Sequence, residues 1–214
     1  MTRPSHIAAL RARVAAFRRD ESGASLVEFG IVVLVFLFLM FAIIDMGRLA
    51  YAWSSAQKAT QVAARLAAVR PPVCAGVPER HLRGTAGASI TYGTLCRNSA
   101  GTCANVAPAS CNGAATSTTA TEIFGAVQPL LPAGATAANL RYTYAFDGNL
   151  GFLGGPYVPM VTVELVNLRF SFVSSLGLMI GPVIGRTSSL GADVVLPPMS
   201  VSVPGEDLAM GTAG

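Results

Sequence analysis

Charged residues and histidines are scarce in this chain of 214 residues. Only 12% of the residues are charged, against 52% that are hydrophobic, and the two histidines are His6 and His81. So little charge is unusual for a freely soluble protein, and we expect attachment to a membrane. A serine- or cysteine-based catalytic triad would have to use His81, and neither a P-loop nor a GxGxxG motif after a strand occurs. We therefore expect no enzyme activity and no cofactor.

Positive charge is also scarce beyond the first 23 residues. Five arginines and two acidic residues give this leader +3 of the chain's net +4: Arg3, Arg11, Arg13, Arg18, Arg19, Asp20 and Glu21. The rest of the chain has no broad basic surface, which argues against binding of nucleic acid. The arginine bias instead predicts a cytoplasmic leader at 1–23 and an extracytoplasmic location for the chain after the apolar run.

Phe29 to Ile44 is free of charge, and acidic residues, Glu28 and Asp45, stand at its two ends. With its neighbours this run approaches the ~20 residues that cross the ~30 Å hydrocarbon core of a bilayer, so we predict one span at about 27–47. A carboxylate in a membrane is costly unless it has a partner, so Glu28 is a candidate functional residue. The alternative is a side chain that reaches the interface. Asp45 and Arg48, three residues apart, are expected to form a local ion pair.

The helical pattern continues past Asp45. Apolar and small residues recur at steps of three and four, forming a seam: Met46, Leu49, Trp53, Ala56, Thr60, Ala63 and Ala67. Pro71 and Pro72 end the pattern, because proline removes a donor and disfavours helix in the residue before it. We predict one helix from about Ala24 to Val69 within a 24–70 segment. Its alanines would let a sheet or neighbouring helices approach closely.

All four cysteines lie in a loop-rich segment, 71–120: Cys74, Cys96, Cys103 and Cys111. An even number on the predicted extracytoplasmic side favours two disulfides, and four cysteines allow three connectivities. We expect Cys74–Cys96 and Cys103–Cys111, since both close short local loops. A zinc site is not expected, because the spacing lacks the CxxC pattern of structural zinc sites.

The sequence of residues 121–214 predicts a small domain of helix and strands. The pattern predicts a helix at Thr121–Leu131 and strands at Leu140–Ala145, Val158–Phe172 and Val194–Val203. The apolar stretch Leu176–Ile184 is too short and too interrupted to cross a membrane. The predicted fold class is therefore α+β: a long N-terminal transmembrane and amphipathic helix packed on a small antiparallel sheet, with a disulfide-stapled loop region.

Four features of the chain resemble those of a known family: the segment Gly23-Ala24-Ser25-Leu26-Val27-Glu28-Phe29, the apolar run, the group Ile44-Asp45-Met46-Gly47-Arg48 and the alanine-rich continuation to Val69. This is the TadE-like family. Its members are minor pilins or pseudopilins of the tight-adherence (Flp) pilus, a branch of the type IV pilus machinery. The resemblance implies cleavage by a prepilin peptidase between Gly23 and Ala24. It also implies that Glu28, beside Phe29, meets the new amine of a neighbouring subunit and fixes the register of assembly.

The partners implied are the peptidase, other pilins or pseudopilins, the pilus assembly platform and the lipid bilayer. The implied location is the bacterial inner membrane, with possible transfer to a pilus or the cell surface, in support of assembly, secretion or adhesion. Two alternatives stay open. One is an uncleaved single-pass membrane protein with an extracytoplasmic binding domain, and the other is a secreted domain cut near residue 50.

Overall fold

The computed structural model describes residues 23–114, 117–173, 193–206, 208 and 209. The predicted leader up to residue 22 and the apolar stretch Leu176–Ile184 lie outside this part of the chain. The chain divides into two compact units, Met1–Gly47 and Arg48–Gly214. Each unit is described by itself below.

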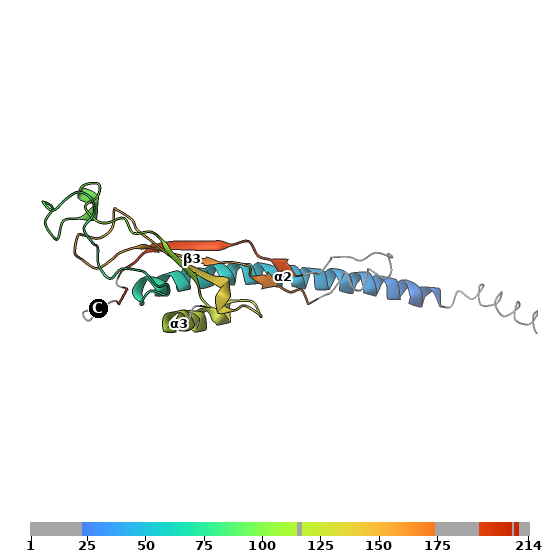
Figure 1. Ribbon diagram of the computed structural model, residues 1–214. Coiled ribbons are helices and arrows are strands. Elements are labelled where there is room, and N and C mark those ends of the chain that lie inside the picture. Colours follow the sequence, from blue (N-terminus) through green and yellow to red (C-terminus); the bar gives the residue numbers. More distant parts are fainter. Residues whose placement is uncertain (1–22, 115–116, 174–192, 207, 210–214) are drawn as a thin grey trace, which may run out of the picture. The chain divides into compact units, whose positions relative to one another are not determined.

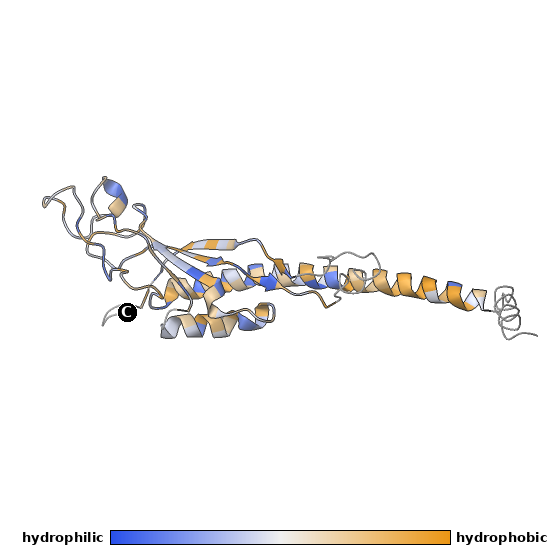
Figure 2. Ribbon diagram, turned by 45° about the vertical axis from the view of Figure 1, so that its right-hand side comes forward, coloured by the Kyte–Doolittle hydropathy of each residue, from blue (hydrophilic) through white to orange (hydrophobic). Residues whose placement is uncertain are grey.

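Helix α2 runs from Ala24 to Val69, 46 residues, as the seam and the two prolines predict. It is the one helix in the described part of the chain that is long and apolar enough to cross a membrane. The part of α2 that belongs to the first unit is mostly hydrophobic, as its colour in Figure 2 shows. A helix of this kind suits a lipid environment rather than one side of a soluble core.

The second unit contains an antiparallel sheet in the order β1-β2-β3-β6. Its strands are β1 (Ala109–Asn112), β2 (Leu140–Ala145), β3 (Met160–Leu165) and β6 (Met199–Pro204). A separate pair joins β4 (Arg169–Phe170) to β5 (Val194–Val195). The predicted α+β class is confirmed, although β1 was not predicted and the long strand expected at Val158–Phe172 is divided into β3 and β4.

The core of the second unit forms where the alanines of α2 meet the inward face of the sheet (Figure 1). Ala56, Thr60, Ala63 and Ala67 are fully buried, as the seam predicts, whereas Met46 is exposed. Strand β2 contributes inward residues at alternate positions, and among them are the rings of Tyr142 and Tyr144. Small helix residues therefore face large strand residues, which lets the helix and the sheet pack closely.

Short helices complete the second unit. Helix α3 (Thr118–Val127) buries Ile123 and Val127, and it begins earlier than predicted because Ser117 caps it by accepting a hydrogen bond from the Ala120 backbone. Among the described residues, 3-10 turns have the bounds Cys96–Asn98 (η1), Gln128–Leu130 (η2) and Ala137–Asn139 (η3).

The predicted disulfide pairing is wrong: the bonds are Cys74–Cys111 and Cys96–Cys103. Cys74 follows the end of α2, where the chain passes the sheet edge formed by β1, and the Cα atoms of Cys74 and Cys111 lie 5.5 Å apart. Packing of helix on sheet thus brings together two cysteines that are 37 residues apart. Cys96 and Cys103 flank a tight turn in which the Thr102 amide donates to the Ser99 carbonyl.

A loop lobe, defined as residues 79–105 and 146–157, forms a second small cluster. Isolated bridges between extended segments connect its two parts: Arg80 with Pro156 and Leu95 with Phe152. Cys96, Cys103 and Leu153 form its buried hydrophobic cluster, with Ile90 and Phe146 packed against them, and Tyr157 is buried beside the His81 ring. Position 84 requires glycine, because a Cβ atom there would collide with the backbone carbonyl of Gly101. So small a cluster depends on its disulfide for order.

Candidate membrane and assembly site

The predicted cleavage junction lies at the start of α2. Gly23 is exposed, a Cβ atom added to it would meet nothing within 4 Å, and Ala24 is the first helical residue. The Gly23 carbonyl accepts a hydrogen bond of 3.2 Å from the Val27 amide. This first turn would have to open for the peptide bond after Gly23 to become extended.

Glu28 lies one turn into the helix and carries the only charge between residues 23 and 44. Its side chain is exposed and makes no ion pair within the described residues. A carboxylate near a helix N-terminus interacts favourably with the helix dipole. If this part of the helix lies in a membrane, a carboxylate here is costly unless it reaches the interface or meets a cationic partner.

Most of the large apolar side chains that follow Glu28 are exposed, whereas Val33 and Phe38 are half-buried. Exposed fractions of 42–73% are found for these large hydrophobic side chains between Phe29 and Ile44: Phe29, Ile31, Val32, Leu34, Val35, Phe36, Leu37, Leu39, Met40, Phe41, Ile43 and Ile44. The segment from Ala24 to Ile44 is roughly 31 Å long at 1.5 Å per residue, close to the thickness of a bilayer core. Its length and composition therefore fit a single span.

Asp45 and Arg48 lie at the boundary between the two units. Asp45 is buried, at 4% exposure, and the Arg48 guanidinium lies 5.5 Å from the centre of the Phe170 ring. That distance is within the range of a cation–π contact. The ion pair expected between Asp45 and Arg48 stays a prediction.

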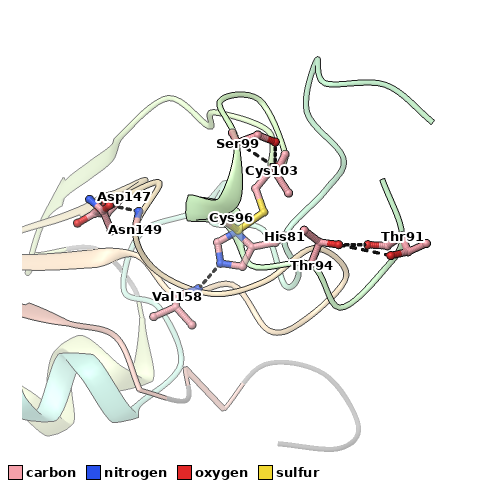
Figure 3. Close-up of a disulfide and its surroundings, with 10 residues drawn as sticks. His81, Thr91, Thr94, Cys96, Ser99, Cys103, Asp147, Asn149 and Val158 are labelled. Carbon is pink, nitrogen blue, oxygen red and sulfur yellow. Dashed lines mark hydrogen bonds between the residues drawn. A yellow bond between two sulfur atoms is a disulfide. The ribbon is translucent and has the colours of Figure 1, made fainter. Parts of the chain in front are cut away.

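The loop lobe contains a buried histidine that the sequence did not single out as a site. His81 is 2% exposed, and its Nε2 accepts a hydrogen bond of 3.1 Å from the Val158 amide (Figure 3). The neutral ring therefore has its proton on Nδ1, which is buried and has no partner among the described residues. Burial lowers the pKa of His81, which favours this neutral form.

The imidazole of His81 lies beside the Cys96–Cys103 disulfide. One of its nitrogens and the two sulfur atoms all lie within 4.8 Å of one another. In the disulfide the sulfurs are not thiolates, and the Nε2 lone pair is occupied by Val158, so the arrangement does not favour a metal ion. The sequence showed only that His81 lies between Cys74 and Cys96. The correct cysteine pairing was needed to recognise its neighbour.

The family model described as TadE-like protein matches residues 23–65, roughly a fifth of the chain. The match begins at the predicted cleavage junction and ends inside α2. No significant match was found among curated proteins or among solved structures.

Proposed function

We propose that this chain, with its TadE-like segment and its helix able to cross a membrane, is a minor pilin or pseudopilin of a tight-adherence (Flp) pilus. These two features fit a membrane protein associated with a Tad pilus system. The start of α2 gives the strongest support for a minor pilin or pseudopilin. The family match starts at Gly23, the helix starts at Ala24, and the single carboxylate Glu28 follows within one turn.

Processing by a prepilin peptidase would cut the bond between Gly23 and Ala24. Glycine at this position offers no side chain that would obstruct an extended backbone in a tight active site. The cut would remove the leader and its arginines, and with them the charge that favours retention on the cytoplasmic side. It would also create a cationic amine at Ala24.

The new amine and Glu28 would form the assembly contact. The positions are four residues apart, roughly 6 Å along the helix axis, so both groups would lie near one end of the apolar helix. The amine of one subunit and the carboxylate of the next would attract each other by about 4 kcal/mol at a separation of 4 Å and an effective dielectric constant of 20. Desolvation offsets much of this attraction, so the contact sets axial register more than it adds stability.

The membrane-length part of α2 is available for this role. From Ala52 onward the buried face of the helix is used by its own sheet. In the first unit, the 18-residue membrane-length window of α2 has none of its residues buried. Subunits would therefore be inserted in the bilayer, and would associate, through this segment.

The experiment that tests the proposal separates cleavage from assembly. Glu28→Gln removes the charge and keeps the shape, and Glu79→Gln is the matched control because Glu79 is exposed in the loop lobe. In cells that produce the pilus, we expect both variants to lose the leader as the unaltered protein does. Only Glu28→Gln should lower the amount of this protein in sheared surface pili. A Glu28→Gln protein that assembles at the unaltered level would refute the register role.

A further inference from the structure

The two disulfides have different surroundings. We infer that Cys96–Cys103 is a thiol-exchange site for a dithiol–disulfide oxidoreductase, whereas Cys74–Cys111 is a purely structural bond. The inference does not depend on the proposed function, because it concerns the loop lobe alone.

The first difference between the two disulfides is the packing that surrounds their sulfur atoms. Cys74 is part of the main core, and its sulfur lies 3.6 Å from the Tyr142 carbonyl oxygen, beside the central sheet. The buried cluster of Cys96 and Cys103 contains only one other hydrophobic residue, Leu153. Less native packing must therefore be disturbed to separate Cys96 from Cys103.

Access from solvent exists at both disulfides, so access alone does not distinguish them. A hollow of about 780 Å³ is lined by Cys96, Cys103, Arg83 and Arg97, and none of the described residues that line it is acidic, although Asp147 lies beside it and accepts a hydrogen bond from the lining residue Asn149. Cys111 lines another hollow of about 630 Å³ with Arg141, but Arg141 pairs with Glu164 at 3.6 Å. Arg83 and Arg97 make no ion pair among the described residues, so they favour the approach of the thiolate that performs disulfide exchange.

His81 supplies the second difference. The Val158 amide fixes the proton of its ring on Nδ1, which has no acceptor among the described residues. The neighbouring sulfur atoms are weak acceptors in the disulfide. A thiolate is a strong acceptor, so this N–H group stabilises the sulfur that leaves when the bond breaks.

The exchange takes place in two steps. A thiolate of the oxidoreductase attacks one sulfur of Cys96–Cys103 and forms a mixed disulfide, and the electron pair of the broken bond goes to the other cysteine sulfur. That thiolate accepts the hydrogen bond from His81 Nδ1. The second thiol of the oxidoreductase then attacks the mixed disulfide, so that the partner is oxidised by two electrons and Cys96 and Cys103 are reduced. Their protons come from the two thiols of the partner, directly or through solvent. The reverse sequence installs the bond.

Reduction would loosen the loop lobe and leave the sheet intact. Two of the four buried hydrophobic residues of the lobe are the cysteines themselves. Strands β2 and β3 belong to the main core, which keeps its own disulfide. Exchange would therefore act on the lobe surface independently of the remainder of the second unit.

The test follows each disulfide separately in one sample. The full-length protein in detergent is treated with dithiothreitol, quenched by alkylation at intervals and analysed by peptide mass spectrometry. We expect Cys96–Cys103 to be reduced about tenfold faster than Cys74–Cys111, the effect of one charge-assisted hydrogen bond. Hydrogen exchange after selective reduction should then increase in the lobe and not in β2 or β3. Equal rates, or earlier reduction of Cys74–Cys111, would overturn the inference.

Two variants test the groups around the bond. His81→Gln should slow reduction of Cys96–Cys103 and leave that of Cys74–Cys111 unchanged; a general loss of packing would accelerate both. Arg97→Ala should slow reduction by glutathione, an anionic thiol, more than reduction by the neutral 2-mercaptoethanol. A rate for Cys96–Cys103 that is unchanged or increased in His81→Gln, or an equal effect of Arg97→Ala on both reagents, would overturn the inference.

Discussion

Two buried tyrosines of the same strand, Tyr142 and Tyr144, provide a matched test of how the main core is built. Both rings are almost completely buried on the inward face of β2. The Tyr144 hydroxyl accepts a hydrogen bond of 3.1 Å from the amide of Val73, the residue before Cys74. The Tyr142 hydroxyl is buried and has no hydrogen-bond partner among the described residues. The same chemical change, Tyr to Phe, therefore removes a satisfied group in one case and an unsatisfied group in the other.

Tyr144→Phe leaves the buried Val73 N–H group without an acceptor, which should lower the free energy of unfolding by about 1–3 kcal/mol. Tyr142→Phe removes a hydroxyl that is desolvated without compensation, so the free energy of unfolding should stay unchanged or rise. For a unit of this size, about 1 kcal/mol corresponds to a shift in melting temperature of about 2–4 °C.

Urea unfolding of the full chain in detergent measures both variants. Trp53 is the only tryptophan and packs against the main core, so its fluorescence reports on the second unit. The dependence of the unfolding free energy on urea should stay the same, which shows that the surface exposed on unfolding has not changed. A Tyr142→Phe variant that loses as much stability as Tyr144→Phe would refute the assignment of these two hydroxyls.

Three further predictions concern stability. Replacing both cysteines of Cys74–Cys111 by alanine should lower the free energy of unfolding in urea by about 4 kcal/mol, against about 2.5 kcal/mol for Cys96–Cys103, because the first bond closes the longer loop. Equal losses for the two pairs would contradict this. Ala63→Leu should lower the free energy of unfolding by about 1–3 kcal/mol, because it overpacks the helix against the sheet. Gln61→Leu, at an exposed position, should change it by less than about 0.5 kcal/mol. Similar losses in both variants would contradict the assignment of Ala63 to the buried face of α2. The pKa of His81 is lowered from 6.5, so its stabilising effect is present above pH 6.5 and is lost as the pH falls below that value. Urea midpoints between pH 7.5 and 5 should fall more steeply for the unaltered protein than for His81→Gln, and parallel curves would contradict this.

Patterns that depend on neighbouring residues could be predicted from the sequence. The steps of three and four from Leu49 to Ala67 and the prolines after Val69 were sufficient for α2, because helix periodicity and termination are local. The alternation of Leu140, Tyr142 and Tyr144 was sufficient for β2 in the same way. Met46 was placed wrongly because the apolar pattern of a membrane-length helix does not distinguish a protein-facing from a lipid-facing side.

Features that depend on the packing of distant segments could not be predicted. Short loops favoured a Cys74–Cys96 bond, yet helix–sheet packing places Cys74 next to Cys111 instead. Strand β1 has only four residues, too few for a clear alternation. The contact of His81 with a disulfide depended in turn on that pairing. Glu28 was found as a carboxylate beside an apolar run, whereas Gly23, Ala24 and Phe29 were found through their resemblance to a family, and their roles in processing and assembly stay predictions.

The most direct test of the central proposal is the N-terminal residue of the protein isolated from cells that produce the pilus. Tandem mass spectrometry of the N-terminal peptide, with a strain that lacks the prepilin peptidase as the control, would identify it. The proposal predicts Ala24 as the N-terminal residue in the presence of the peptidase and an intact leader in its absence. A leader that is retained in both strains, or a cut near residue 50, would contradict it.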